Sequence, residues 1–223
     1  MYNILTLNKI AAIGTSRLGD NYKYGDDVQN PDAVLVRSAA MHDMEFADNL
    51  LAIARAGAGT NNIPKDKCSE QGIVVFNTPG ANANAVKELV IAGLLISNRK
   101  IIEGYEWAKT LKGNGAAVGK MVEKGKSQFV GPEIKGKTLG VIGLGAIGQL
   151  VANAAIALGM EVYGYDPYVS VKAAWNLSSE VKYISDVKDI YKECNYITVH
   201  VPALDSTKGM INKEAFDLMQ DGT

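Results

Sequence analysis

The feature that most constrains the fold of this chain is a glycine-rich loop set between an apolar strand and a helix. The strand Thr138-Leu139-Gly140-Val141-Ile142 runs directly into the segment from Gly143 to Gly148, which has the pattern GxGxxG. This pattern alone is a weak signal, because glycine-rich turns follow many strands. Here Asp166 follows Gly143 by 23 positions, at the end of the next expected strand. That order of elements predicts a βαβ unit that binds a dinucleotide.

Each position of the loop has a separate physical role in this prediction. Gly143 permits the tight turn after the strand, Gly145 lets a pyrophosphate approach the backbone, and Gly148 lets the helix pack close to the strand. The phosphates would then bind to free N–H groups near Ala146 and Ile147, at the positive end of the helix dipole.

The carboxylate of Asp166 predicts which dinucleotide is bound. It would accept hydrogen bonds from the adenosine ribose hydroxyls, and its charge would repel a 2′-phosphate. No Lys or Arg lies between Pro167 and Val171 to offset that repulsion. The pattern therefore favours NAD over NADP, with a plain strand-ending turn at Asp166-Pro167 as the alternative interpretation.

Short β-branched runs alternate with longer segments of helical period, which favours an α/β fold with parallel strands. Strands are expected at residues 2–7, 33–37, 51–54, 73–76, 138–142, 161–165, 181–184 and 196–201, and helices at 83–97, 100–111, 147–158, 186–194 and 213–219, the last capped by Asn212. We expect two domains, 1–98 and 99–223. The helix at 83–97 has apolar residues on so much of its surface that we expect it to be buried between the two units. A Gly- and Lys-rich connector is expected up to Lys137.

Composition excludes several classes of protein. The formal net charge is -1, so no broad attraction to nucleic acid or to an anionic membrane is expected. The N-terminal residues lack the pattern of a secretory signal and no apolar stretch is long enough to span a bilayer, which indicates a cytoplasmic protein. Cys68 and Cys194 are far apart with no CxxC motif, so neither a disulfide nor a metal site is expected.

Several further motifs occur in a fixed order along the chain. They are Val36-Arg37-Ser38, Arg55-Ala56-Gly57-Ala58-Gly59, the segment Asn77 to Asn82, Glu88-Leu89, Gly136 to Gly140, the glycine loop, Gly164-Tyr165-Asp166-Pro167, and His200-Val201-Pro202 followed by Ser206-Thr207. With these residues, the sequence resembles the NAD-dependent D-2-hydroxyacid dehydrogenase family, and within it the phosphoglycerate dehydrogenases, over the whole chain. The resemblance implies a flavodoxin-like N-terminal substrate domain and a Rossmann NAD-binding domain, both incomplete here.

The resemblance also implies roles for residues of the substrate domain. Arg37 and Ser38, with Asn82 nearby, would hold the substrate phosphate or carboxylate, and an arginine fork suits such oxyanions. Arg55 would either face the phosphate or brace the fold. The backbone N–H groups around Ala58 and Gly59 would cradle the substrate carboxylate. Lys126 occupies a place where some relatives supply a lysine from a neighbouring subunit to the substrate phosphate, although a solvated lysine is the simpler interpretation.

In the nucleotide domain, the resemblance assigns His200, Val201 and Pro202 to the wall of the cofactor site and Thr207 to the loop that caps it. It assigns no catalytic residue to this chain, because the family's catalytic arginine, glutamate and histidine belong to motifs that do not occur among residues 1–223. We therefore expect an N-terminal portion of a longer enzyme that forms a homo-oligomer, with apolar surface left exposed in the portion and no activity of its own.

The implied activity is NAD-dependent oxidation of 3-phospho-D-glycerate to 3-phosphohydroxypyruvate, which begins the phosphorylated route to L-serine. Two alternatives remain open. One is a related dehydrogenase that acts on glyoxylate, lactate or another 2-hydroxy acid. The other is a regulatory protein that binds NAD on the same fold without catalysis.

Overall fold

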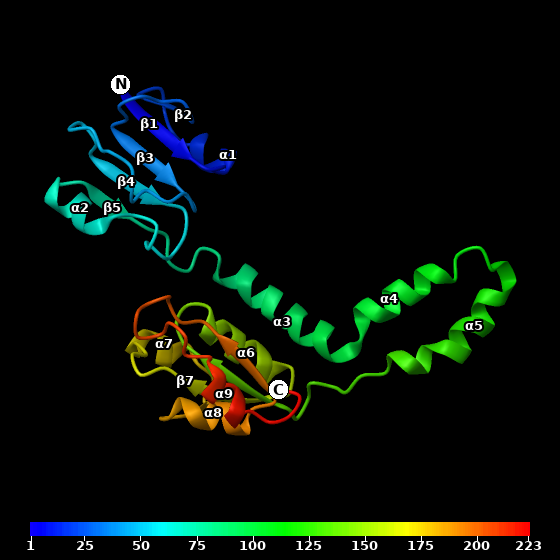
Figure 1. Cartoon of the computed structure of the whole chain (residues 1–223). Helices are drawn as coiled ribbons and strands as arrows, with labels where there is room; N and C mark the ends of the chain where they lie inside the picture. The colour runs from blue at the N-terminus through cyan, green and yellow to red at the C-terminus, as the bar shows by residue number, and fades with distance from the viewer. The chain divides into compact units, whose positions relative to one another are not determined.

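The computed structural model describes all 223 residues, and they form two compact units (Figure 1). The N-terminal unit comprises Met1–Asn82 and the C-terminal unit Ala83–Thr223. The units divide before helix α3 (Ala83–Arg99), whereas the sequence suggested a boundary after residue 98. The physical reason is that Leu94 of α3 belongs to the hydrophobic core of the C-terminal unit.

The N-terminal unit contains a five-stranded parallel sheet with the order β2-β1-β3-β4-β5. Its strands are β1 (Tyr2–Leu7), β2 (Tyr22–Gly25), β3 (Ala33–Val36), β4 (Ala52–Arg55) and β5 (Val74–Phe76), with short helices α1 (Ala12–Thr15) and α2 (Lys65–Glu70) between them. This strand order is that of the flavodoxin-like doubly wound folds, so the expected fold class is confirmed.

One face of this sheet has a buried core and the other leaves apolar side chains exposed. Val34, Val36 and Ile53 belong to the core together with Met41 and with Cys68 of α2. Because side chains alternate along a strand, Val74 and Phe76 of β5 lie on the opposite face of the sheet, where they are 51% and 57% exposed. Parallel sheets are ordinarily covered on both faces, so this surface agrees with the expectation of exposed apolar area.

The C-terminal unit contains a four-stranded parallel sheet with the order β8-β7-β6-β9. The strands are β6 (Thr138–Ile142), β7 (Glu161–Tyr165), β8 (Lys182–Tyr183) and β9 (Tyr196–Val199), and the helices between or after them are α6 (Gly148–Ala157), α7 (Val171–Asn176), α8 (Val187–Glu193) and α9 (Lys213–Leu218). Strands β7 and β8 are added on one side of β6, and β9 is then added on its other side. The switch point of this Rossmann sheet therefore lies between β6 and β9. Asn212 caps α9 as expected, because its Oδ1 accepts from Ala215 N at 3.0 Å.

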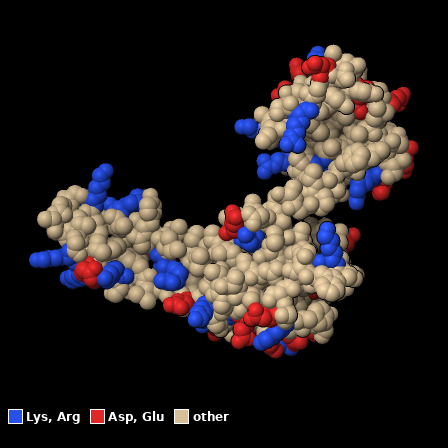
Figure 2. Space-filling view, turned by 180° about the vertical axis from the view of Figure 1, so that it is seen from behind, with Lys and Arg blue, Asp and Glu red and all other residues tan.

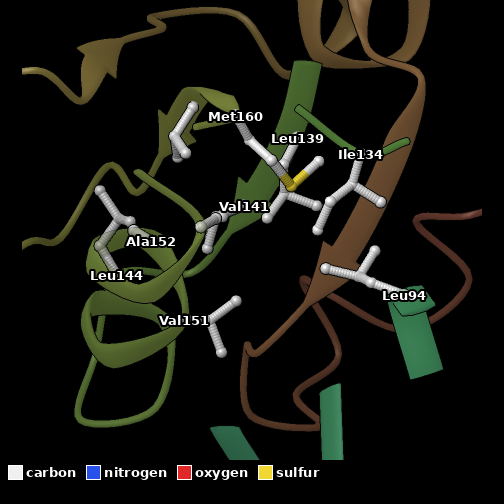
Figure 3. Packing of buried hydrophobic residues seen from close by; sticks show 10 residues of the cluster. Leu94, Ile134, Leu139, Val141, Leu144, Val151, Ala152 and Met160 are labelled. Atoms are coloured by element: carbon white, nitrogen blue, oxygen red, sulfur yellow. The ribbon is translucent and has the colours of Figure 1, made fainter. Parts of the chain in front are cut away.

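The sheet of this unit packs against two buried hydrophobic clusters, one that includes α3 and α6 and one that includes α8 and α9. Figure 3 shows Leu139 and Val141 of β6 beside Val151 of α6 and Leu94 of α3. The β6 residues and Val151 are fully buried. This packing fixes α6, and therefore the loop that precedes it, against the end of β6.

Helix α3 is covered by its own unit on one face, and its burial between the two units stays a prediction. Val90, Ile91 and Leu94 pack into the core, but Leu89 is 74% exposed. Only the face that meets α6 is covered, and the remaining apolar residues lie at the surface.

The segment expected as a Gly- and Lys-rich connector contains helical turns that its composition did not predict. Helix α4 (Ile101–Thr110) is followed by the 3-10 turns η1 (Gly115–Ala117) and η2 (Lys126–Phe129), with α5 (Val118–Gly125) between them. Trp107 packs on Phe129 with ring centroids 5.1 Å apart, and a Cβ at Gly125 would overlap the Trp107 ring. Aromatic contacts therefore order a segment whose composition is typical of a loop.

The surface is mixed in character. Figure 2 shows basic and acidic side chains scattered among large uncharged areas on the face in view, in keeping with the net charge of -1.

Both cysteines are free and buried, and burial raises the pKa of the Cys194 thiol to about 12. No helix has the length and apolar character needed to cross a membrane.

Candidate functional site

The glycine loop of the C-terminal unit adopts a conformation that requires glycine at two of its positions. Gly143 has φ +93°, and its N–H donates to Tyr165 O at 2.8 Å. A Cβ there would lie 2.9 Å from the carbonyl group of His200. A Cβ on the buried Gly148 would overlap the carbonyl oxygen of Gly143. The close approach of α6 to the end of β6 therefore depends on both glycines.

The middle of the loop is open and offers unused hydrogen-bond donors. Gly145 is exposed, and a Cβ built on it would meet no atom within 4 Å. The N–H groups of Gly145, Ala146 and Ile147 have no acceptor within the chain. They lie at the N-terminus of the ten-residue helix α6, where the macrodipole adds partial positive charge. The residues present thus fit the pyrophosphate of a dinucleotide, as the sequence predicted.

Asp166 lies directly after β7 and is fixed by the loop itself. Its Oδ2 accepts from Leu144 N at 2.8 Å, and its Oδ1 accepts from Tyr168 N at 2.8 Å. The carboxylate is partly buried, whereas the neighbouring Pro167 is exposed. Each carboxylate oxygen keeps a second lone pair, so the held group can still accept from a ribose hydroxyl.

His200 follows β9, and the backbone places it beside the end of β6. The backbone N–H of His200 donates to Ile142 O at 2.7 Å, and the ring Nε2 lies 2.9 Å from Thr198 Oγ1. Burial lowers the pKa of the His200 imidazole below its usual value of 6.5, so the ring is neutral at physiological pH. A neutral ring suits a cofactor wall and supplies no positive charge.

The segment 199–211 lines a groove of about 550 Å³, and Val201, Pro202 and Thr207 are among its lining residues. The Thr207 hydroxyl donates to Pro202 O at 2.6 Å and accepts from Leu204 N at 3.0 Å. Thr207 therefore closes the loop on itself, and its hydroxyl is already engaged. The predicted cofactor residues all lie at the carboxyl ends of β6, β7 and β9.

In the N-terminal unit, the predicted substrate residues follow two neighbouring strands. Val36 pairs with Arg55 in the register of β3 and β4, so Arg37 and Ser38 leave the sheet at the same edge as the segment after Arg55. Arg37 and Ser38 are exposed. The Arg37 guanidinium makes no ion pair or hydrogen bond within the chain, which leaves all its donors free for a ligand.

Arg55 has a different role in the structure. Its Nε donates to Arg37 O at 3.0 Å, and its Nη1 donates to Gly59 O. The guanidinium thus joins the two segments that follow β3 and β4, which favours the bracing role over direct contact with a phosphate. The N–H groups of the exposed Ala58 and Gly59 have no acceptor within the chain, in agreement with an anion cradle at this loop.

Two asparagines that sequence reasoning did not single out as site residues support these loops. Asn77 Nδ2 donates to Ala58 O at 2.7 Å, and Asn8 Oδ1 accepts from the N–H groups of Ser38 and Ala39. Each asparagine directly follows a strand, β1 for Asn8 and β5 for Asn77. An asparagine directly after an expected strand, at the same edge of the sheet as Arg37, was the available signal.

The structure does not bring every expected residue into these loops. Asn82 is exposed directly before α3, and its side chain makes no hydrogen bond. Lys126 Nζ forms an ion pair with Glu123 Oε2 at 2.7 Å in the C-terminal unit. Both residues remain predictions as ligand contacts.

Comparison with known proteins connects this geometry to a family. Residues 91–223 match the family described as D-isomer specific 2-hydroxyacid dehydrogenase, NAD binding domain. The D-3-phosphoglycerate dehydrogenase of Methanocaldococcus jannaschii is 35% identical over 198 residues, which cover 87% of this chain and 35% of that protein. The hydroxypyruvate reductase of Thermotoga maritima is 40% identical over 194 residues, covering 86% of this chain and 58% of that protein.

This chain therefore spans about a third to somewhat over half of the length of such relatives. Among solved structures, NAD+-bound 3-phosphoglycerate dehydrogenase from Entamoeba histolytica matches with a TM-score of 0.73 and 24% identity, over 98% of this chain and 68% of that one. That likeness shows a shared fold. The family match covers the glycine loop, Asp166 and the segment from His200 to Thr207, which are the residues predicted to form the dinucleotide site. The chain belongs to the D-isomer specific 2-hydroxyacid dehydrogenase family, and residues 91–223 carry its NAD-binding domain.

Proposed function

We propose that this chain provides the substrate-binding and NAD-binding parts of a D-3-phosphoglycerate dehydrogenase, which oxidises 3-phospho-D-glycerate to 3-phosphohydroxypyruvate and so begins phosphorylated L-serine biosynthesis. The observation that carries the proposal is the pair of loops after β3 and β4. Arg37 offers an unpaired guanidinium, and Ala58 and Gly59 offer free amides. Two separate groups of donors suit a substrate with two anionic groups, a phosphate and a carboxylate.

The residues of this chain would bind and orient rather than exchange protons. NAD, when bound, supplies the acceptor for the hydride. The reaction also needs a base for the hydroxyl proton and a cation to polarise the developing carbonyl. His200 bonds Thr198 and is neutral, His42 is exposed with its Nε2 on Asn61 O at 2.9 Å, and Arg55 is engaged with carbonyl groups. We therefore propose that residues 1–223 alone give no turnover.

Two alternatives belong to the same proposal. The likeness to a hydroxypyruvate reductase favours a dehydrogenase for another small 2-hydroxy acid. A non-catalytic NAD-binding regulator on this fold would use the glycine loop without needing Arg37. We further propose a cytoplasmic location and a homo-oligomeric full-length protein.

The test is calorimetric titration of the chain with 3-phosphoglycerate and with D-lactate, which lacks the phosphate. We expect 3-phosphoglycerate to bind more tightly, and Arg37→Ala to weaken it by about 10- to 150-fold, because charge-assisted hydrogen bonds contribute roughly 1.5–3 kcal/mol. Arg37→Lys should restore only part of the affinity, since it keeps the charge and loses the fork.

D-Lactate is the control in the same experiment. Its weak binding should change little in Arg37→Ala. An equal loss for both ligands would assign Arg37 to the carboxylate or to the fold, and would favour an unphosphorylated 2-hydroxy acid. Tight binding of neither ligand together with strong NAD binding would favour the regulatory alternative.

A further inference from the structure

Asn8 lies directly after β1 in a conformation that ordinary side chains avoid. Its φ is +67°, in the left-handed region where asparagine is tolerated better than most residues. The residue is part of no other functional assignment made above. Its side chain reaches across to the segment after β3, 30 positions further along the chain.

A single oxygen of Asn8 holds two consecutive backbone amides. Its Oδ1 accepts from Ser38 N at 2.8 Å and from Ala39 N at 2.7 Å. The next carbonyl in this segment, Ala39 O, accepts from Asn62 Nδ2 at 2.8 Å. The segment 37–39 is therefore held by side chains, because no strand pairing extends to it.

The peptide group between Arg37 and Ser38 is held at both ends. Its carbonyl oxygen accepts from Arg55 Nε at 3.0 Å, and its N–H donates to Asn8 Oδ1. Fixing this peptide plane restricts the backbone on either side of it, including the Cα of Arg37 from which the free guanidinium extends. It also uses the Ser38 amide, so Ser38 has only its hydroxyl to offer a ligand.

We propose that Asn8 is a positioning residue for substrate binding, which aims Arg37 and the Ser38 hydroxyl by locking the 37–39 turn. This inference rests on the proposed function of that turn as the substrate anion site. Asn8 itself touches no ligand. Its contribution is preorganisation, because a turn already held in the binding conformation loses less entropy when the anion binds.

The test compares three variants of the whole chain. Asn8→Gly removes the acceptor and keeps a residue that adopts positive φ without strain. Asn8→Asp keeps a side-chain acceptor. The matched control is Asn30→Gly, because Asn30 also has positive φ, at +48°, and is exposed with a side chain that makes no hydrogen bond.

The first measurement is amide hydrogen exchange at Ser38 and Ala39, resolved by NMR. We expect exchange at both amides to be at least about tenfold faster in Asn8→Gly and close to wild type in Asn8→Asp and Asn30→Gly. Unchanged exchange in Asn8→Gly would overturn the proposal. Equal acceleration in Asn8→Asp would overturn it as well, because the acceptor would then be irrelevant.

The second measurement is calorimetric binding of 3-phosphoglycerate and of NAD. We expect Asn8→Gly to bind 3-phosphoglycerate about tenfold more weakly and NAD as wild type does, with Asn30→Gly unchanged for both. Wild-type affinity for 3-phosphoglycerate in Asn8→Gly would overturn the positioning role alone. A wild-type chain that does not bind 3-phosphoglycerate would contradict the proposed function, and the positioning role would fail with it.

Discussion

At the scale of single residues, the two units use polar side chains to fix backbone as well as to meet ligands. Asp166 shows this most clearly, because its carboxylate accepts from Leu144 N in the glycine loop and from Tyr168 N in its own turn. The sequence predicted only its ribose contact. The structure adds that the same group ties the start of the loop to the end of β7.

Replacing Asp166 separates these two roles. We expect Asp166→Ala to lower NAD affinity about tenfold or more, because both the ribose contact and the anchor of the loop are lost. Asp166→Asn keeps an acceptor oxygen without the charge, so it should retain more NAD affinity and lose discrimination against the 2′-phosphate of NADP. Calorimetric titration with NAD and NADP measures both. Tighter binding of NADP than of NAD by the wild type would contradict the assignment.

His200 makes unfolding depend on pH. Because burial lowers its pKa in the folded state below 6.5, the unfolded state binds the proton more readily. The neutral His200 ring therefore contributes fully to the free energy of unfolding above about pH 6.5. This contribution is lost as the pH falls toward the folded-state pKa. We expect less than about 1 kcal/mol from this partly exposed ring.

The measurement is urea unfolding between about pH 7.5 and pH 5. His200→Asn should show a smaller loss of unfolding free energy over this range than the wild type. Equal slopes for His200→Asn and wild type would argue against a partly buried, neutral ring at His200.

At the scale of elements, the sequence predicted those with strong periodicity and missed those that depend on distant contacts. Strands β1, β6 and β7 have the predicted bounds, since each is a short apolar run ended by a polar or glycine residue. Strand β2 was missed because Tyr22–Gly25 is a four-residue edge strand whose residues are mostly exposed. Helix α7 was missed because it is only six residues long, and α5 because glycines flank its apolar positions.

Two glycines of the loop, Gly145 and Gly148, provide a matched pair of substitutions. Gly148→Ala should destabilise the C-terminal unit by roughly 2–3 kcal/mol, because the new Cβ meets a backbone carbonyl that cannot move freely. Gly145→Ala should leave stability within about 1 kcal/mol of wild type, because its Cβ enters open space. Urea unfolding followed by circular dichroism compares them. Equal destabilisation would mean that the loop is packed differently.

At the scale of the whole molecule, the sequence was sufficient for the fold class, the cofactor and the family, because an ordered set of motifs specifies them. It could not decide the role of Arg55, since the choice between a ligand and a carbonyl depends on where the backbone of Arg37 and Gly59 lies. It also could not find Asn8, whose partners are 30 and 31 positions away. Contacts of this range follow from sheet order, which single-sequence patterns do not specify.

The central claim is that each unit holds its own ligand, NAD on the glycine loop and a phosphorylated hydroxy acid on the turn that carries Arg37. The most direct measurement is calorimetric titration of NAD and of 3-phosphoglycerate into wild type, Gly145→Ala and Arg37→Ala. The account predicts that each variant weakens the binding of one ligand only. Gly145→Ala should lose affinity for NAD and keep wild-type affinity for 3-phosphoglycerate. Arg37→Ala should bind 3-phosphoglycerate at least about tenfold more weakly and keep wild-type affinity for NAD. Wild-type affinity for NAD in Gly145→Ala, or for 3-phosphoglycerate in Arg37→Ala, would contradict it.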